Sequence, residues 1–90
     1  MQMTLKIEKN GDGRKSIIRL SGWLRSEHLA ELNTQLKGDW VRIALDLDSV
    51  TLVDVEAVRF LNTCEEGGIE LLHCWPYIRE WMLREKQGGK

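Results

Sequence analysis

The 90-residue chain has no excess of basic residues, because 13 Lys and Arg stand against 14 Asp and Glu and the formal net charge is -1. Nucleic-acid-binding domains usually carry a clustered basic excess, so we expect no DNA or RNA partner. The sequence also has no apolar run of about 18 residues and no signal-peptide core at its start. These absences lead us to expect a cytoplasmic protein that does not enter a membrane.

Cysteine is scarce, and the two residues present do not form a recognisable pattern. Cys64 and Cys74 are too few for a disulfide framework, and a cytosolic setting would keep them reduced. Together with His73 they suggest metal ligation, but no Cys-x-x-Cys motif or second pair completes a tetrahedral zinc site. We therefore expect no metal and interpret both cysteines as small buried hydrophobic residues.

Recognisable catalytic arrangements are missing as well. His28 has no serine or cysteine nucleophile at a motif spacing, so a catalytic triad is not indicated. Gly11 and Gly13 lie between two expected strands, whereas the dinucleotide-binding fingerprint needs a strand-to-helix turn. We expect a non-enzymatic protein without a cofactor.

What is present is an ordinary globular composition, with 42% hydrophobic and 30% charged residues. A chain of this length forms one domain, so we expect a single domain over 1–90 with frayed ends at 1–2 and 87–90. Apolar residues recur with the period of strands in four segments and with that of helices in three. The strands are expected at Met3–Glu8, Arg14–Ser21, Arg42–Asp48 and Ile69–Cys74, and the helices at Ser26–Leu36, Val55–Glu66 and Pro76–Lys86.

Local signals mark the ends of these elements. Ser26 and Asp54 are good N-cap residues for the first two helices, and Pro76 suits the first turn of the third. Gly22 is expected to close the second strand, and residues 49–53 are expected to form a loop. Residues 10–13, Asn-Gly-Asp-Gly, should turn the first two strands into a hairpin, while Gly38 and residues 67–68 end helices.

The resulting order is β-β-α-β-α-β-α. Strands separated by helices normally pair in parallel through right-handed crossovers. If the last three strands lie side by side in sequence order, both crossover helices cover the same face of the sheet. The alternation in Arg42–Asp48 agrees, because a strand covered on both faces would be continuously apolar. We predict a single-layer α/β fold, with a four-stranded mixed sheet and helices mainly on one face.

The run ALDLDSVTLVD, from Ala44 to Asp54, resembles the signature of the STAS family, the anti-sigma-factor antagonists. It has a hydrophobic strand with an internal Asp, a short loop with an apolar pair, and an Asp that opens a helix. The segment IIRLSGWL, Ile17–Leu24, resembles the second strand of that family and its glycine. The resemblance extends from Leu5 to about Trp81, and it implies the STAS fold.

The resemblance also implies a function, partner switching, in which the domain docks onto a serine kinase or anti-sigma factor and phosphorylation releases it. The phosphorylated Ser or Thr of the family directly follows the Asp that opens the second helix. In this chain Asp54 is followed by Val55, which has no hydroxyl, so the usual switch is missing. Glu56 places a fixed negative charge in the same turn, either as an imitation of the phosphate or as an ordinary first-turn acid. Ser49 and Thr51 remain as possible phosphoacceptors or as simple turn hydroxyls.

Aromatic residues should gather at one edge of the sheet. Trp23 follows the second strand and Trp75 the fourth, so both should lie at the carboxyl edge of the parallel strands together with residues 48–54, whereas Trp40 should lie at the opposite edge. Open α/β sheets bind ligands and partners at the carboxyl edge, and tryptophan is frequent in interface hot spots. Trp23 and Trp75 are therefore either part of an interaction patch or lids of the core.

Three functional hypotheses follow. The leading one is a regulatory module that docks through Asp54, Val55, Glu56, Trp75 and Trp23 onto a serine kinase, an anti-sigma factor or another STAS protein. The second is a scaffold or homodimer that assembles through the uncovered sheet face or the first strand. The third and weakest is a small-molecule-binding domain, which would need a deep pocket lined by His73.

Overall fold

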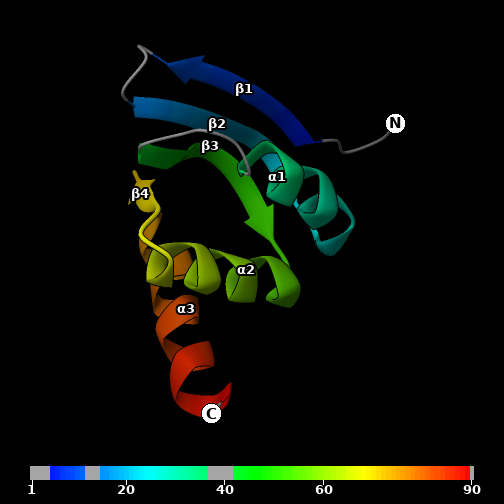
Figure 1. Ribbon diagram of the computed structural model, residues 1–90. Coiled ribbons are helices and arrows are strands. Elements are labelled where there is room, and N and C mark those ends of the chain that lie inside the picture. The colour runs from blue at the N-terminus through cyan, green and yellow to red at the C-terminus, as the bar shows by residue number, and fades with distance from the viewer. Residues whose placement is uncertain (1–4, 12–14, 37–41, 90) are drawn as a thin grey trace, which may run out of the picture.

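The computed structural model describes residues 5–11, 15–36 and 42–89 (Figure 1). The predicted order of strands and helices is confirmed, with a short 3-10 turn added before the first helix. The strands are β1 (Leu5–Gly11), β2 (Lys15–Leu24), β3 (Arg42–Val53) and β4 (Glu70–Leu72). The helical elements are η1 (Ser26–His28), α1 (Leu29–Leu36), α2 (Val55–Glu66) and α3 (Pro76–Gly89).

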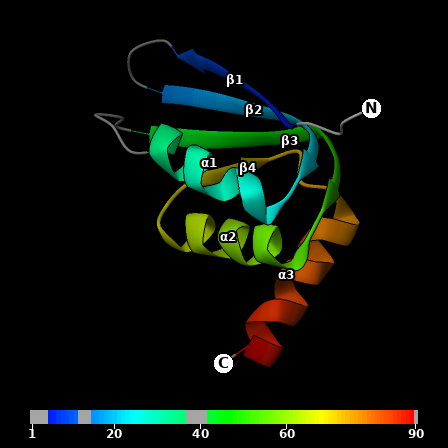
Figure 2. The ribbon, with the colours of Figure 1, turned by 90° about the vertical axis from the view of Figure 1, so that its right-hand side faces the viewer.

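The four strands form one mixed sheet in the order β1-β2-β3-β4. β1 pairs with β2 in antiparallel fashion, and β2, β3 and β4 are parallel neighbours. This confirms the predicted arrangement in sequence order. α1 and α2 lie on the same side of the sheet, and α3 leaves β4 and passes α2 (Figure 2).

The core lies between the sheet and the helices. Ile18 and Leu20 of β2 and Leu45 and Leu47 of β3 are fully buried, as the period-two patterns predicted. Burying a side chain of this size contributes roughly 1.5–3 kcal/mol, so this layer is a main source of stability. The helices contribute the fully or nearly fully buried apolar side chains of Leu32, Ala57, Val58, Leu61, Cys64, Ile78 and Met82.

The opposite face of the sheet is covered by ion pairs between charged side chains. Lys6 and Glu8 lie 3.3 Å apart on β1, and Lys15 of β2 lies 3.3 Å from Glu70 of β4. The predicted wet face thus carries polar groups. Asp46 of β3 is nevertheless buried, with only 7% of its surface exposed.

The end of β3 differs from the prediction. Residues 49–53 were expected to form a loop, but β3 continues through them to Val53. The reason is a partner that sequence patterns do not reveal, since β2 also continues beyond Gly22 and pairs Trp23 with Leu52 and Leu24 with Val53. Gly22 has φ 106° and lies beside a register shift, so it bends β2 rather than ending it.

Three further boundaries are corrected. Ser26 is not an N-cap but the first residue of η1, and its N–H donates to a side chain elsewhere in the fold. β4 is confined to residues 70–72, because His73 adopts φ 54° and leaves the strand direction. α3 continues to Gly89, past the end predicted at Lys86. The expectations for residues 1–4, Gly13, Arg14, Gly38, Trp40 and residue 90 fall outside the described residues.

Candidate functional site

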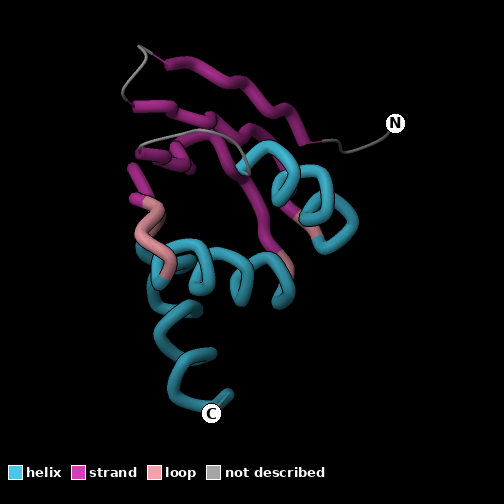
Figure 3. Tube along the Cα trace, in the orientation of Figure 1, coloured by secondary structure: helices cyan, strands magenta, loops and turns pink. Residues whose placement is uncertain are grey.

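The site begins at the junction between β3 and α2, where Asp54 is the only residue separating the two elements (Figure 3). The predicted capping role of Asp54 is confirmed, because its Oδ1 accepts the N–H of Ala57 at 2.9 Å. Its Oδ2 accepts the N–H of Ser26 at 2.9 Å. One carboxylate therefore satisfies the amino ends of α2 and η1 together, which holds the end of β2 against the start of α2.

The next two residues form the first turn of α2. Val55 is half-buried, and Glu56 is exposed. The Oε2 of Glu56 lies 3.4 Å from Nη1 of Arg59, whose Nε lies 3.0 Å from Oε1 of Glu85. The hydrogen bond and charge of Glu85, together with the charge of Glu56, raise the pKa of Arg59. The fixed negative charge of Glu56 is therefore shared with a cation on its own helix.

Two aromatic side chains lie at the start of α3 and its preceding loop. Trp75 and Tyr77 are each 44% exposed, and Leu52 of β3 is 47% exposed. The indole N–H of Trp75 donates to the backbone carbonyl oxygen of Asp48 at 3.2 Å. The hydroxyl of Tyr77 donates to the backbone carbonyl oxygen of Thr51 at 2.9 Å. We call Trp75 and Tyr77 the aromatic patch. Both side chains are hydrogen-bonded to the backbone of β3. The prediction of aromatic residues beside residues 48–54 is therefore confirmed.

A pocket of about 330 Å³ opens between the aromatic side chains and β3. Ser49 and Thr51, the two candidate phosphoacceptors, are exposed and contribute to its wall. The structure places both hydroxyl residues at the surface, and their modification remains a prediction. We call this space the aromatic pocket, and its lining residues are Asp48, Ser49, Val50, Thr51, Trp75 and Tyr77.

Trp23 belongs to the adjacent strand. It is half-buried and pairs with Leu52 in the β2–β3 register. The guanidinium carbon of Arg25 lies 4.5 Å from the centre of a Trp23 ring, which is within cation–π range. Arg25 also forms a 2.8 Å ion pair with Glu27. Arg25 thus covers part of Trp23, and the sequence alone did not predict this contact.

Asp46 and His73 are a second pair that sequence analysis did not identify as part of the site. The Oδ1 of Asp46 accepts the N–H of Asp48 at 3.0 Å and lies 3.0 Å from Nδ1 of His73, while Oδ2 lies 3.7 Å from Nε of Arg19. Burial favours the neutral acid, but the bonds from Asp48 and His73 and the charges of His73 and Arg19 outweigh it and lower the pKa of Asp46. Asp46 therefore anchors the turn that leads to Trp75. The sequence indicated a special role for Asp46 only through the position of an acid inside a hydrophobic strand.

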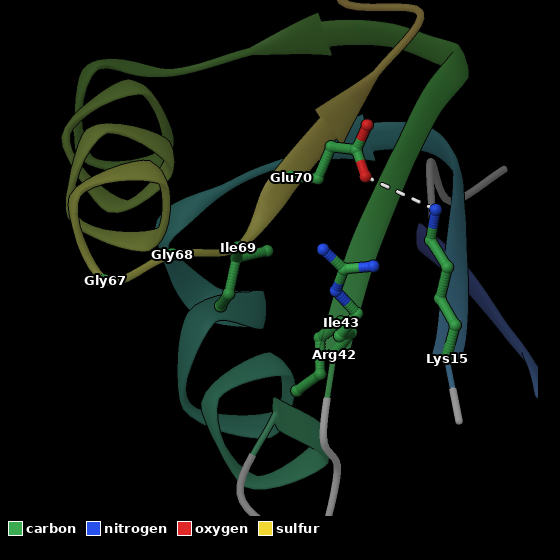
Figure 4. A pocket seen from close by; sticks show the side chains of 7 residues that line it. All are labelled: Lys15, Arg42, Ile43, Gly67, Gly68, Ile69 and Glu70. Carbon is green, nitrogen blue, oxygen red and sulfur yellow. Dashed lines mark ion pairs between the residues drawn. The ribbon is translucent and has the colours of Figure 1, made fainter. Parts of the chain in front are cut away.

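A different pocket, of about 670 Å³, lies at the amino ends of β3 and β4. Lys15 points across β3 toward Glu70, and the Arg42 side chain enters the same space (Figure 4). The N–H groups of Gly67, Gly68 and Ile69 donate to the last carbonyls of α2. These backbone donors are therefore committed, and the pocket lacks the open amide cradle of a phosphate-binding loop. It lies at the other end of β4 from His73, and its lining residues are Lys15, Arg42, Ile43, Gly67, Gly68, Ile69 and Glu70.

The two cysteines are free thiols. Cys64 is buried as predicted, and burial raises its pKa to about 11. Cys74 is only half-buried, so the expectation of two buried cysteines is wrong for this residue. Within the described residues, no group of three or more His, Cys, Asp or Glu side chains is arranged to hold a metal ion. No helix among those residues has the length and apolar character needed to cross a membrane.

Comparison with known proteins identifies the fold. No family model matches the chain, and no curated protein matches it by sequence. Among solved structures, the chain is similar to the antisigma-factor antagonist STAS domain from Rhodobacter sphaeroides, with a TM-score of 0.55 and 19% identity over 78% of this chain and 85% of that one. The chain therefore has a STAS-type fold, as its resemblance in sequence implied.

Proposed function

We propose that this chain is a non-enzymatic, cytoplasmic regulatory domain that docks onto another protein through the carboxyl edge of its sheet. The docking surface comprises the aromatic patch, Trp23 and the turn Asp54–Glu56. The partner is a serine kinase of the anti-sigma-factor type or another STAS protein. Its free thiols are consistent with a reducing compartment.

The single observation that carries this proposal is the exposure of Trp75 and Tyr77 at the edge where open α/β sheets meet their ligands. A buried aromatic ring needs no partner, but two large rings that are each 44% exposed leave apolar surface in water. Aromatic side chains dominate the energy of protein interfaces. The hydrogen bonds to Asp48 and Thr51 hold the rings in place before a partner arrives.

Regulation of this domain would differ from the phosphorylation switch expected from the family resemblance. Val55 follows the capping residue Asp54 directly and has no hydroxyl to receive a phosphate. Glu56 places a carboxylate in that turn permanently, although Arg59 shares its charge. Docking would then be controlled by the supply of the partner or by Ser49 and Thr51, the exposed hydroxyls on β3.

The test is calorimetric titration of the purified chain with each anti-sigma-type serine kinase and STAS protein encoded in its source genome. Trp75→Ala is expected to weaken binding at least tenfold, because truncation of a hot-spot aromatic residue costs about 2 kcal/mol or more. Glu56→Ala should have a smaller effect. Leu83→Ala is the matched control, since Leu83 is a 51% exposed apolar residue farther along α3. Equal losses in Trp75→Ala and Leu83→Ala would refute the proposed surface.

Self-assembly is a second candidate function, and the sheet order favours it. Among the residues that the structure describes, β1 pairs with β2 alone, which leaves its other edge available for strand addition. In an antiparallel pairing of two β1 strands centred on Ile7, Lys6 of each copy would face Glu8 of the other, so the charges would be complementary. Sedimentation velocity over a range of concentrations tests this candidate. A monomer that persists at the highest concentration would exclude it.

A further inference from the structure

We infer that the aromatic pocket receives an arginine side chain of the docking partner. This inference rests on the proposed function, because it names the chemical group that enters one part of the proposed surface. Three features of its lining lead to it: the aromatic residues Trp75 and Tyr77, the acidic residue Asp48, and the apolar residue Val50.

The aromatic walls favour a cation over other groups. Trp75 and Tyr77 both line the pocket, and a cation near such rings is attracted by their negative faces. Arginine suits this environment better than lysine, since its planar guanidinium stacks on aromatic rings and is more weakly hydrated than an ammonium group. The rings therefore favour a flat cation that gives up its water readily.

The carboxylate of Asp48 provides the second argument. Asp48 is exposed and lines the pocket, and within the described residues its side chain makes no ion pair or hydrogen bond. The carboxylates of Asp46 and Glu65, by contrast, are paired with His73 and Arg79. An apolar partner side chain in this pocket would remove water from Asp48 and give its charge no compensation, which is unfavourable. A guanidinium would compensate it with two parallel hydrogen bonds.

Val50 provides the third argument, because it is an apolar residue in the lining of the same pocket. The arginine side chain has an apolar stem of three methylene groups that covers hydrophobic surface while its charged end remains near water. A stem beside Val50 with the guanidinium at Asp48 would use both the apolar and the acidic residue of the lining. Small acidic or neutral polar groups would match only one of the two.

Neighbouring cations do not oppose this occupant. Nη1 of Arg79, the basic residue closest to Tyr77 along α3, lies 2.9 Å from Oε1 and 3.0 Å from Oε2 of Glu65. His73, two residues before Trp75, is held by Asp46 at 3.0 Å. Arg79 and His73 thus each have a carboxylate partner already, and Asp48 remains for an incoming cation.

The experiment needs only the isolated chain. The indole N–H signal of Trp75 is assigned in a nitrogen-proton spectrum with the Trp75→Phe variant, and is followed during titration with N-acetyl-arginine amide. The neutral isostere N-acetyl-citrulline amide and the apolar N-acetyl-norleucine amide are the matched probes. We expect arginine to saturate the shift in the millimolar range and to bind about three- to tenfold more tightly than either control.

Variants separate charge from shape. Asp48→Asn keeps the shape of the pocket, and we expect it to bring the affinity for the arginine probe close to that of the citrulline probe. Glu66→Gln, on the distant end of α2, should leave the titration unchanged. Equal binding of arginine and citrulline, tighter binding of norleucine, or no shift with any probe would each overturn the inference.

Failure of the inference would be distinguishable from failure of the proposed function. If Trp75→Ala weakens binding of the whole partner while the arginine probe shows no preference, the docking surface stands and its arginine occupant is wrong. If the probe prefers the pocket but Trp75→Ala leaves all partner titrations unchanged, the pocket binds arginine and the proposed docking surface is wrong.

Discussion

The backbone N–H of Ser26 donates to Oδ2 of Asp54 at 2.9 Å, although 28 residues separate them in sequence. Oδ1 of the same carboxylate caps α2 through Ala57. The N–H of Asp54 donates to the carbonyl oxygen of Leu24 at 3.3 Å. Asp54 is therefore bonded to the chain around the end of β2 through both its backbone and its side chain. Asp54 thus links two chain segments in addition to starting a helix.

Replacement of Asp54 should therefore cost more than the loss of a single cap. We expect Asp54→Ala to lower the free energy of unfolding by about 2 kcal/mol, since a lost cap typically costs about 1 kcal/mol and two are removed here. Asp54→Asn should lose about half as much, because Asn keeps one acceptor oxygen for Ala57 and offers Ser26 only an amide donor. Urea denaturation measures both values. Wild-type stability in Asp54→Asn would show that the Ser26 bond contributes nothing.

Acid should weaken the protein through Asp46. The pKa of Asp46 in the folded protein lies below its usual value of 3.8, so the unfolded chain takes up the proton first as the pH falls. Its stabilisation is therefore complete above about pH 5 and is lost as the pH falls through 4 and below. We expect Asp46→Asn to cost about 1–3 kcal/mol at neutral pH and progressively less in acid.

The measurement compares urea midpoints of wild type and Asp46→Asn at several pH values. Glu66→Gln is the control, because Glu66 is an exposed acid on the far end of α2. A constant difference between wild type and Asp46→Asn across the acid range would contradict this assignment.

The two thiols should differ in reactivity. Burial raises the pKa of Cys64 to about 11, so roughly one thousandth of it is thiolate at pH 8. Burial raises the pKa of Cys74 too, with Arg79 opposing and Glu65 adding to the effect. Ellman's reagent should label Cys74 slowly in the native protein, and should label Cys64 only after unfolding. The Cys74→Ser and Cys64→Ser variants assign each phase, and fast native labelling of Cys64 would be inconsistent with its burial.

The glycine pair after α2 offers a matched comparison of backbone freedom. Gly68 has φ 99°, where a β-carbon is strained, although no atom lies within 4 Å of its ideal position. Gly67 has φ -83°, and a β-carbon there would make ordinary contacts of 3.5 Å. We expect Gly68→Ala to cost about 1 kcal/mol and Gly67→Ala to change stability by less than about 0.5 kcal/mol in urea denaturation. Equal effects would exclude backbone strain as the cause.

The sequence predicted the elements that depend on local patterns. The alternation in β3, the cap at Asp54 and the proline that starts α3 all act within a few residues, and each was placed correctly. It did not predict that residues 49–53 form a strand, because Asp48, Ser49 and Thr51 interrupt the alternation. What makes this segment a strand is pairing with β2, which is a long-range contact. Gly22 was misread for the same reason.

The site shows the same division. Sequence reasoning placed Trp23 and Trp75 at the correct edge, but left open whether they are surface or core residues. Trp23 is half-buried and Trp75 is exposed, and the contacts that hold each ring are not visible in local sequence patterns. Arg25 lies over Trp23, and the indole of Trp75 donates to the carbonyl oxygen of Asp48. The Asp46–His73 pair was missed because 27 residues separate the two, and no local spacing reports such a contact.

The strand order has a consequence for how the chain is made. Because the order in space equals the order in sequence, each strand joins the edge of a sheet that earlier residues have already begun. No strand has to insert between two others, and the closed loops remain short, which lowers the entropic cost of each step. The chain can therefore assemble from its first strand onward as it leaves the ribosome. β4 and the rings of Trp75 and Tyr77 follow the other three strands, so the edge that carries these rings is completed only after the rest of the sheet has been synthesised.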